Sequence, residues 1–450
     1  ISEEKSMEEE LIELDKINAL VFSFFCESSD FNGIRLRNIS ESLGLDYIES
    51  IDKVKQLVQK GDISIQSSTN PCIIGFGHHT IASQLNVLDD AKSIKLSKKT
   101  FGALEIFTEN TEYSICLYPS KEYLEKNRDL SEFGYAKYKT ALALAEPQLS
   151  FRFFETDVLE RYSGDPRFEF VFEDFGGSIS CKYDESGNAI LREEDQVFVQ
   201  SFGLGFDSKS NKVIAIILRD LGRLSPAHQV FWATKEVPAS ECTVLSDYYD
   251  NIILGAWIFS RSVFSALIDE INAIHKLTSF IFGVSLFRKE LNGENRPKNF
   301  TFFFAPTTKN YYDFINLLDK YLSENINQSF FEGKLNLYER KPIDENTFER
   351  IQKGTLRLLE EWISTAFTYT DESIPREIMA PLKKVRKERQ KPAHKVIDNN
   401  YDTSLISLQK GIIEACYQSV GSIRRMIQSH PKAINVGLDD RLDQDNVKSF

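Results

Sequence analysis

The chain has 450 residues, more than a single hydrophobic core usually serves, and a formal net charge of -13 excludes a surface that attracts nucleic acid everywhere. Hydrophobic residues make up 42% of the chain, which is typical of a globular protein and excludes a largely disordered one. No apolar run reaches the ~18 residues that cross a bilayer, and the six cysteines are scattered singly. We therefore expect a cytoplasmic protein of α+β class with several domains, without a membrane anchor, zinc knuckle or disulfide framework.

Residues 1–90 predict a domain that resembles a winged helix-turn-helix. Apolar residues recur at helical spacing in residues 8–26, a short helix follows Ser40, and another amphipathic helix begins near Asp46. We expect residues 60–62 to end that helix and a β-hairpin to follow as far as residue 77. The order helix, helix, turn, helix and hairpin is the basis of the resemblance.

The charges of this domain disfavour DNA binding. The N-terminal part of the expected recognition helix carries Asp46, Glu49 and Asp52. This part of such a helix meets base edges in the major groove, where carboxylates repel the phosphates. We therefore favour contact with a partner protein over contact with DNA.

Residues 91–300 predict a mixed α/β domain with antiparallel strands. The expected strands lie in residues 114–120, 168–174, 195–206 and 212–218, and the expected helices in residues 121–146, 225–237 and 260–280. The short loop 207–211 predicts that the strands on either side of it form a hairpin. No glycine-rich loop of the kind that binds nucleoside triphosphates occurs, and we expect no metal or other cofactor.

Four carboxylates in this domain leave open a metal-dependent nuclease, namely Asp165, Glu169, Glu173 and Asp174. They alternate with aromatic residues, and no lysine lies at the sequence position relative to these acids that a metal-dependent nuclease site requires. The solvent face of a sheet is therefore the favoured interpretation of these acids.

Residues 301–450 predict a helical bundle. The 3.6-residue apolar period is present in residues 314–331, 347–367, 375–390 and 403–428. Short loops between these segments favour an up-and-down arrangement.

The segment "VRKERQKPAH" at residues 385–394 is basic, in contrast to the acidic chain as a whole. Residues 376–395 hold eight basic and two acidic side chains, a net charge of +6 that is typical of a phosphate-binding surface. The candidate RNA-binding residues are Lys383, Lys384, Arg386, Lys387 and Lys391. Pro392 is expected to end the helix at about Lys391, so that Arg389 and His394 lie on either side of the break.

Arg389 and His394, separated by four residues before the last helix, resemble the signature of the HEPN family of small helical bundles, found in bacterial toxins and antiviral ribonucleases. The resemblance covers roughly the last 100–150 residues. It implies a metal-independent endoribonuclease of a defence or toxin type, with Arg389 and His394 as catalytic residues and two protomers that bring their motifs together in a homodimer. Gln390 departs from the family, which usually has Asn, Asp or His directly after the arginine, and this leaves activity more open than fold.

The residue types suit RNA cleavage. RNA carries its own nucleophile, the 2′-hydroxyl, next to the scissile phosphorus. An imidazole can accept that proton or donate one to the leaving 5′-oxygen, and Arg389 can stabilise the charge on the pentacoordinate phosphorus. Arg386, one helical turn earlier, would hold a flanking phosphate.

Two other Arg–His pairs match the same spacing. Arg223 precedes His228, where Ser225 as N-cap and Pro226 at the first helical position explain the pattern structurally. Arg424 and Arg425 precede His430 at the end of a helix, where basic residues favour the negative end of the helix dipole.

The alternative to a ribonuclease is a non-catalytic interaction or regulatory protein. In that case the winged helix would bind a partner and the bundle would only dimerise. A regulatory partner protein is compatible with both functions.

Overall fold

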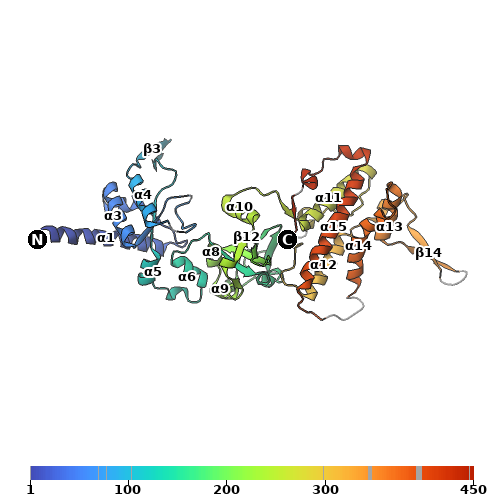
Figure 1. Cartoon of the computed structure of the whole chain (residues 1–450), viewed down its shortest axis with the longest axis horizontal. Helices are drawn as coiled ribbons and strands as arrows, with labels where there is room; N and C mark the ends of the chain where they lie inside the picture. Colours follow the sequence, from blue (N-terminus) through green and yellow to red (C-terminus); the bar gives the residue numbers. More distant parts are fainter. Residues whose placement is uncertain are drawn as a thin grey trace. The chain divides into compact units, whose positions relative to one another are not determined.

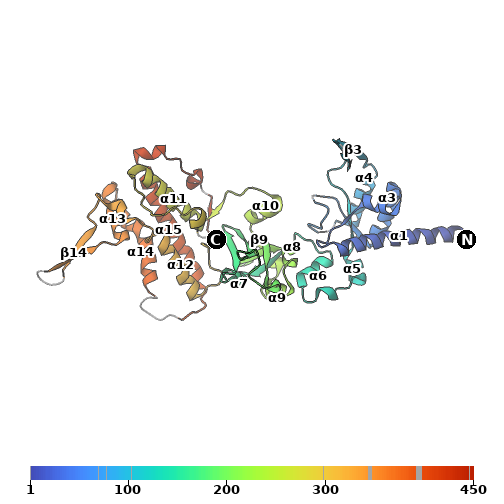
Figure 2. The same cartoon turned by 180° about the vertical axis from the view of Figure 1, so that it is seen from behind.

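The structure is a computed structural model that describes residues 2–68, 70–77, 79–102, 104–296, 298–342, 347–391, 398–444 and 446–449. The chain divides into two compact units (Figures 1 and 2). The first unit contains residues 1–154, 180–202 and 214–243, and the second contains residues 155–179, 203–213 and 244–450. The chain is a mixed α/β protein with antiparallel sheets and a helical C-terminal region, as expected. The domain boundaries expected near residues 90 and 300 stay predictions.

The helices of the first unit are α1 (Ser2–Glu27), α2 (Leu36–Leu43), α3 (Tyr47–Lys60), α4 (Ile81–Ala91), α5 (Lys121–Asn127), α6 (Lys137–Ala143), α8 (Leu218–Gly222) and α9 (Pro226–Ala233). The helices of the second unit are α7 (Glu160–Ser163), α10 (Ser246–Leu254), α11 (Val263–Phe282), α12 (Thr308–Tyr321), α13 (Thr355–Ala366), α14 (Ile374–Gln390) and α15 (Ser404–Gln428).

A three-stranded sheet has the order β1 (Ile34–Arg35), β5 (Cys116–Pro119), β2 (Ile63–Gln66). A seven-stranded sheet has the order β11 (Glu236–Val237), β6 (Phe151–Glu155), β10 (Lys212–Ile217), β9 (Phe198–Asp207), β8 (Gly176–Cys181), β7 (Phe168–Glu173), and β12 (Cys242–Val244) pairs with β9. Three further pairs are β3 (Leu96–Phe101) with β4 (Leu104–Glu109), β14 (Tyr338–Pro342) with β15 (Phe348–Gln352), and β13 (Arg261–Ser262) with β16 (Val447–Lys448).

Two N-terminal helices, α1 and α3, form where the sequence predicts them. The start predicted for α2 at Ser40 is wrong, because α2 begins at Leu36 with Arg35 as its N-cap and Ser40 lies buried inside the helix. Asp46 caps α3 by accepting hydrogen bonds from the backbone N–H groups of Ile48 and Glu49, and Gly61 ends the helix with a φ of 83°. The apolar stripes of α1, α2 and α3 meet in one core that also takes in β2 and β5. The helix signals of α1 and α3 are therefore confirmed.

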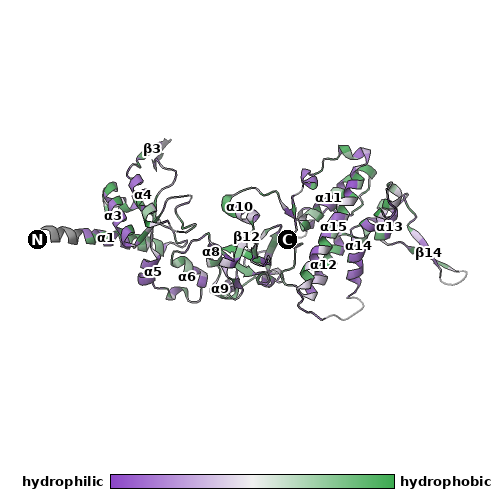
Figure 3. Cartoon of the chain, in the orientation of Figure 1, coloured by the Kyte–Doolittle hydropathy of each residue, from purple (hydrophilic) through white to green (hydrophobic). Residues whose placement is uncertain are grey.

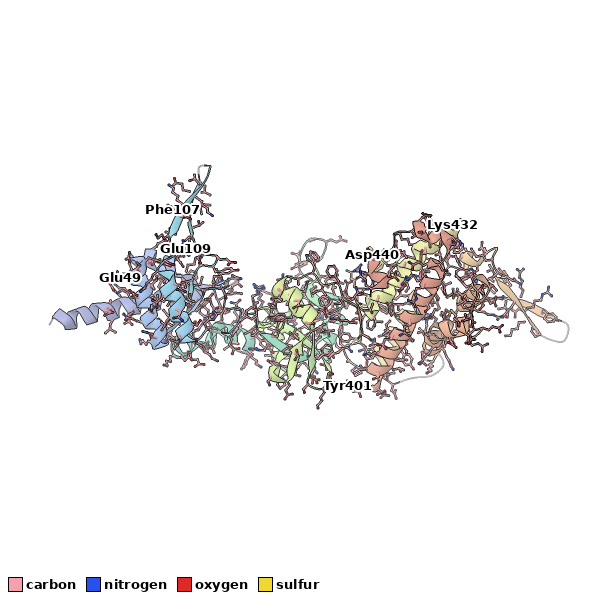
Figure 4. All side chains as sticks on the ribbon, turned by 45° about the horizontal axis from the view of Figure 1, so that its top comes forward. Glu49, Phe107, Glu109, Tyr401, Lys432 and Asp440 are labelled. Atoms are coloured by element: carbon pink, nitrogen blue, oxygen red, sulfur yellow. The ribbon has the colours of Figure 1, made fainter. Side chains whose placement is uncertain are left out.

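The hairpin expected after residues 60–62 is wrong. In the described residues from 63 to 77 the one strand is β2, and its antiparallel partner is β5, with Ile65 opposite Leu117. β1 pairs with the other edge of β5. Burial of the apolar side chains of β2 and β5 selects this distant partner, which no local pattern could indicate. The hairpin β3–β4 lies between them in the chain and exposes 62% of Phe107 (Figure 4).

The strands expected around 168–174, 195–206 and 212–218 are present as β7, β9 and β10. β9 and β10 are neighbours in the sheet, and the N–H of Asp207 donates to the carbonyl oxygen of Asn211 at 3.0 Å. This closes the short loop between them, so the predicted hairpin is confirmed.

Four expected helices are shorter than predicted. The helix expected in residues 225–237 ends at Ala233, before the strand β11 begins at Glu236. Residues 121–146 form α5 and α6, separated where the extended backbone of Arg128 and the side chain of Asp129, which accepts from the N–H of Ser131 at 2.9 Å, make a turn. In the segment 314–331, helix α12 ends at Tyr321. Residues 347–367 begin as β15 and become helical only at Thr355, because pairing with β14 overrides the local helical period.

The helical part of the second unit surrounds α14. This helix contacts α12, α13 and α15, and α15 packs along α11 (Figures 1 and 2). A buried ion pair joins the last two, with Arg424 Nε 2.8 Å from Glu270 Oε2 and both side chains 1% exposed. Each charge is satisfied by the other, which is the condition for keeping either in a core.

Lys212, at the start of β10, is a lysine largely removed from water. Its Nζ lies 5.0 Å from the centroid of the Phe302 ring. Burial lowers the pKa of Lys212 to about 8, and the charge of Lys410 acts in the same direction. The folded state therefore disfavours the charged form of this side chain.

Replacement of Lys212 by Met is expected to stabilise the protein at pH 7 and to have much less effect at pH 10. An unfolded lysine titrates near pH ~10.4, so the unfolded chain binds more protons than the folded chain between about pH 8 and that value. The free energy of unfolding of the wild type should therefore rise with pH in this window. That of the variant should change less. Urea unfolding at both pH values measures this, with Lys320→Met on exposed α12 surface as the control. Equal effects of Lys212→Met at the two pH values would contradict it.

Candidate functional site

Helix α14 presents the basic segment. Pro375 lies in its first turn, and Met379, Leu382 and Val385 form its buried face. The basic residues lie on the remaining surface, and α14 is hydrophilic toward its C-terminal end (Figure 3). The helix ends at Gln390 with Lys391 as its C-cap, which confirms the end predicted from the following proline.

Arg386 and Arg389 meet one buried carboxylate on α12. The Nη1 atoms of Arg386 and Arg389 lie 2.7 and 2.6 Å from Asp319 Oδ2. The two arginines stand three positions apart in the sequence, so they lie on the same side of the helix. The side chain of Asp319 is 1% exposed, and its Oδ1 accepts a hydrogen bond from the hydroxyl of Ser323. Both oxygens of this buried carboxylate are therefore hydrogen-bonded.

Glu324 is a second carboxylate at the same place. It accepts a hydrogen bond from Arg389 Nη1 and lies 3.8 Å from Arg386 Nη1. The hydrogen bonds from Arg389 to Asp319 and Glu324 raise the pKa of its guanidinium, which keeps it charged. Both contacts use Nη1, and no other residue in the described part of the chain accepts from its Nε or Nη2. The site therefore holds a guanidinium in place with donors left for a further acceptor.

The lysines of the segment have different surroundings. Lys383 Nζ lies 2.6 Å from Glu360 Oε2 on α13, and Lys391 Nζ lies 2.7 Å from Glu388 Oε1. Lys384 and Lys387 are exposed and form no ion pair with the residues that the structure describes. Part of the predicted +6 charge is thus neutralised within the protein. His394 lies outside the described residues.

The pair Arg223 and His228 has a structural explanation. The side chain of Ser225 accepts from the N–H of His228, and Pro226 occupies the first turn of α9. The ring of His228 is buried, with Nε2 3.2 Å from the carbonyl oxygen of Asp195. The interpretation of this pair as a helix start is confirmed.

Arg424 and His430 also form interactions within the folded protein. Arg424 is 1% exposed and binds Glu270 and Asp443, the latter through Nη1 at 2.9 Å. His430 Nδ1 accepts from the N–H of Lys432 at 3.2 Å. An arginine buried in a core ion pair is not placed to reach a substrate.

The four carboxylates near β7 have separate partners. Asp165 pairs with Arg167 at 2.7 Å, Glu169 with Lys298 at 2.5 Å and Glu173 with Arg296 at 3.5 Å, and Asp174 accepts from the N–H of Ser262 at 2.8 Å. Across the described ranges, no group of three or more His, Cys, Asp or Glu side chains is arranged to hold a metal ion. Among these described residues, none of the helices combines the length and the apolar composition that crossing a bilayer requires.

Asp319 and Glu324 were not predicted as site residues. A signal for Asp319 was present, because it is an acidic residue inside the apolar stripe formed by Ile315, Leu318 and Leu322. A charge at such a position requires a buried partner. The sequence does not indicate which cation on which helix supplies that partner.

Comparisons of the chain with models of protein families, with curated proteins and with solved structures found no match. The site is therefore interpreted from its own residues.

Asp319→Asn is expected to destabilise the protein by about 1–3 kcal/mol, because it removes the charge that holds two arginines of α14 on α12. Urea unfolding followed by tryptophan fluorescence measures this change. The matched control is Asp313→Asn on the same helix, where the exposed pair with Lys309 is worth less than about 0.5 kcal/mol. Equal changes in the two variants would show that Asp319 does not hold the helices together.

Proposed function

We propose that the chain is a cytoplasmic, metal-independent endoribonuclease of a defence or toxin type, in which Arg389 and His394 act on the scissile phosphate. The observation that supports it is the placement of Arg389 at the end of α14. A buried carboxylate holds its Nη1 while Nε and Nη2 have no acceptor in the described part of the chain. His394 follows in the sequence after four intervening residues, beyond the end of the helix.

The reaction needs only groups of the protein and of the RNA. His394 accepts the proton of the 2′-hydroxyl, the 2′-oxygen forms a bond to phosphorus, and the bond from phosphorus to the 5′-oxygen breaks. The leaving 5′-oxygen takes up a proton from water, and His394 returns its proton to the solvent. The products are a 2′,3′-cyclic phosphate and a 5′-hydroxyl.

Arg389 would stabilise the charge that develops on the phosphoryl oxygens. Its contacts with Asp319 and Glu324 fix the guanidinium before the substrate arrives, so little reorganisation is required during reaction. Those two carboxylates also offset the charge of Arg386 and Arg389. The exposed Lys384 and Lys387 are the members of the segment best placed to meet flanking phosphates.

The proposal includes a homodimer, as the family resemblance implies, because one Arg–His pair makes only half of the two-protomer site. A partner protein that controls access to this site is compatible with the arrangement.

The protein is expected to cleave total tRNA and a labelled single-stranded RNA in excess EDTA, leaving 2′,3′-cyclic phosphate ends. His394→Ala and Arg389→Ala should each lower the rate by about 10²-fold or more, because each removes a group that acts in the transition state. Gel analysis of labelled products measures this. Arg376→Ala, at the other end of α14, removes one exposed basic charge and should leave the rate within about twofold.

Cleavage that persists in both variants would show that Arg389 and His394 are not the catalytic residues. Wild type and variants that are equally inert would favour the non-catalytic interaction protein.

A second function, binding of a partner protein, is supported for the first unit. Three helices, α1 to α3, pack with an antiparallel sheet of order β1-β5-β2, the set of elements that a winged helix has. The exposed surface of α3 carries Asp46, Glu49 and Asp52, with Glu49 labelled in Figure 4. Its lysines are paired, since Lys53 Nζ lies 2.6 Å from Glu13 and Lys55 Nζ lies 2.6 Å from Asp89. Such a surface repels the DNA backbone.

Any affinity of the full chain for duplex DNA is expected to disappear when Lys384→Ala/Lys387→Ala is combined with Arg340→Ala/Arg350→Ala. The four changes remove exposed cations of α14 and of the hairpin β14–β15, and the lysines of α3 are paired with carboxylates. Fluorescence anisotropy with a labelled duplex at several salt concentrations measures this. Salt-dependent DNA binding that survives in this quadruple variant would show that the winged-helix region contacts DNA.

A further inference from the structure

Asp319, Glu324, Arg386 and Arg389 are here called the Asp319 cluster. An open cavity of about 480 Å³ lies beside this cluster. Its lining includes three cations, Arg288, Lys353 and Arg386, and one described acid, Glu324. The lining is therefore positive in a chain whose formal charge is -13. Arg386 and Glu324 belong to both the cavity and the cluster, so a molecule in the cavity would lie next to the arginines of α14.

The cations of the cavity are held by the fold. Arg288 Nε donates to the carbonyl oxygen of Ile326 at 3.1 Å, and its backbone N–H donates to Asn325 O at 2.7 Å. Lys353 Nζ lies 2.6 Å from Glu361 Oε2. Side chains that are already positioned lose little conformational freedom when they bind an anion.

The hairpin β14–β15 continues from the cavity, since Gln352 and Lys353 line it and β15 ends at Gln352. In Figures 1 and 2 the hairpin extends away from the helices of its unit. Its register pairs Tyr338 with Gln352, Arg340 with Arg350, and Pro342 with Phe348.

This register separates the side chains of the hairpin by face. Cross-strand partners and residues two apart share a face. One face, here called the basic–aromatic face, therefore carries Tyr338, Arg340, Phe348 and Arg350 and no acid. The other face carries Glu339, Lys341, Glu349 and Ile351.

The basic–aromatic face has the groups that bind unpaired nucleotides. The guanidinium carbon of Arg350 lies 3.9 Å from the centroid of the Tyr338 ring, and Phe348 is 58% exposed. Arginines meet backbone phosphates, and exposed rings stack on bases whose faces are free, as they are only in single strands. A duplex offers its phosphates but no free base face.

We propose that the basic–aromatic face and the cavity at its base bind the single-stranded RNA that flanks the cleaved bond. This inference rests on the proposed ribonuclease function and names the form of its substrate. The strand would run along the hairpin, pass the cations of the cavity and reach Arg389 at the end of α14.

The test measures binding of a labelled, unstructured 15-nucleotide RNA by fluorescence anisotropy in EDTA, over a range of salt concentrations. The full chain carries His394→Ala so that the RNA stays intact. Arg340→Ala/Arg350→Ala should weaken binding about tenfold at low salt and reduce the slope of log K against log salt by about 1.4, since each lost phosphate contact on a single strand contributes about 0.7. Phe348→Ala should weaken binding about fivefold or more with an unchanged slope, because stacking releases no counterions.

The matched control is Lys341→Ala, which removes a cation from the same strand but the opposite face, and should leave the slope and affinity near those of the parent. Arg340→Lys/Arg350→Lys should retain the slope. Circular dichroism melting of each variant verifies that the hairpin change leaves the fold intact.

The inference is overturned if Lys341→Ala weakens binding as much as the two-arginine variant, if a duplex RNA binds as tightly as the single strand, or if the parent binds no RNA. It is also overturned if polyglutamate competes as well as RNA of equal charge, which would indicate a protein partner. Binding through this face by a wild type that cleaves nothing would support the inference and reject the ribonuclease. If the wild type cleaves RNA but its RNA binding does not depend on these residues, the ribonuclease proposal is supported and this inference is rejected.

Discussion

The buried carboxylate of Asp319 is the constraint on which the candidate site depends. An ionised group removed from water is unfavourable unless it is paired and hydrogen-bonded, and here two arginines of α14 and Ser323 satisfy it. Because Arg386 and Arg389 lie one turn apart, one carboxylate holds both only when α12 and α14 pack in this register. The same ionic interaction therefore fixes both the packing of the two helices and the position of Arg389.

The same pairing limits what the basic segment does by itself. Lys383 and Lys391 are bound to Glu360 and Glu388, and the charges of the two arginines are offset by two acids. An acidic chain that binds RNA then needs cations outside this segment. The basic–aromatic face and its cavity supply such cations. The second strand of that face, β15, lies in residues that were expected to begin the helix 347–367.

Local signals predicted the elements that carry the site, and non-local pairing caused the errors. The apolar period and the following proline placed α14, and Asp46 and Gly61 mark the two ends of α3. The strand β15 was missed because its partner β14 stabilises it through backbone hydrogen bonds that a helical side-chain period does not reveal. The partner of β2 was missed for the same reason, since β5 follows only after α4 and the β3–β4 hairpin.

The sequence by itself determined the helix periods and caps, the clustering of basic residues in 376–395, and the spacing of Arg389 and His394. These depend on interactions within a few residues, which a linear pattern contains. Only the tertiary structure decided which charges remain available, because Asp319 and Arg389 are 70 residues apart and meet only when α12 and α14 pack. It likewise placed Tyr338, Arg340, Phe348 and Arg350 on one face, since the register of two strands, and not the order of residues, sets which side chains share a surface.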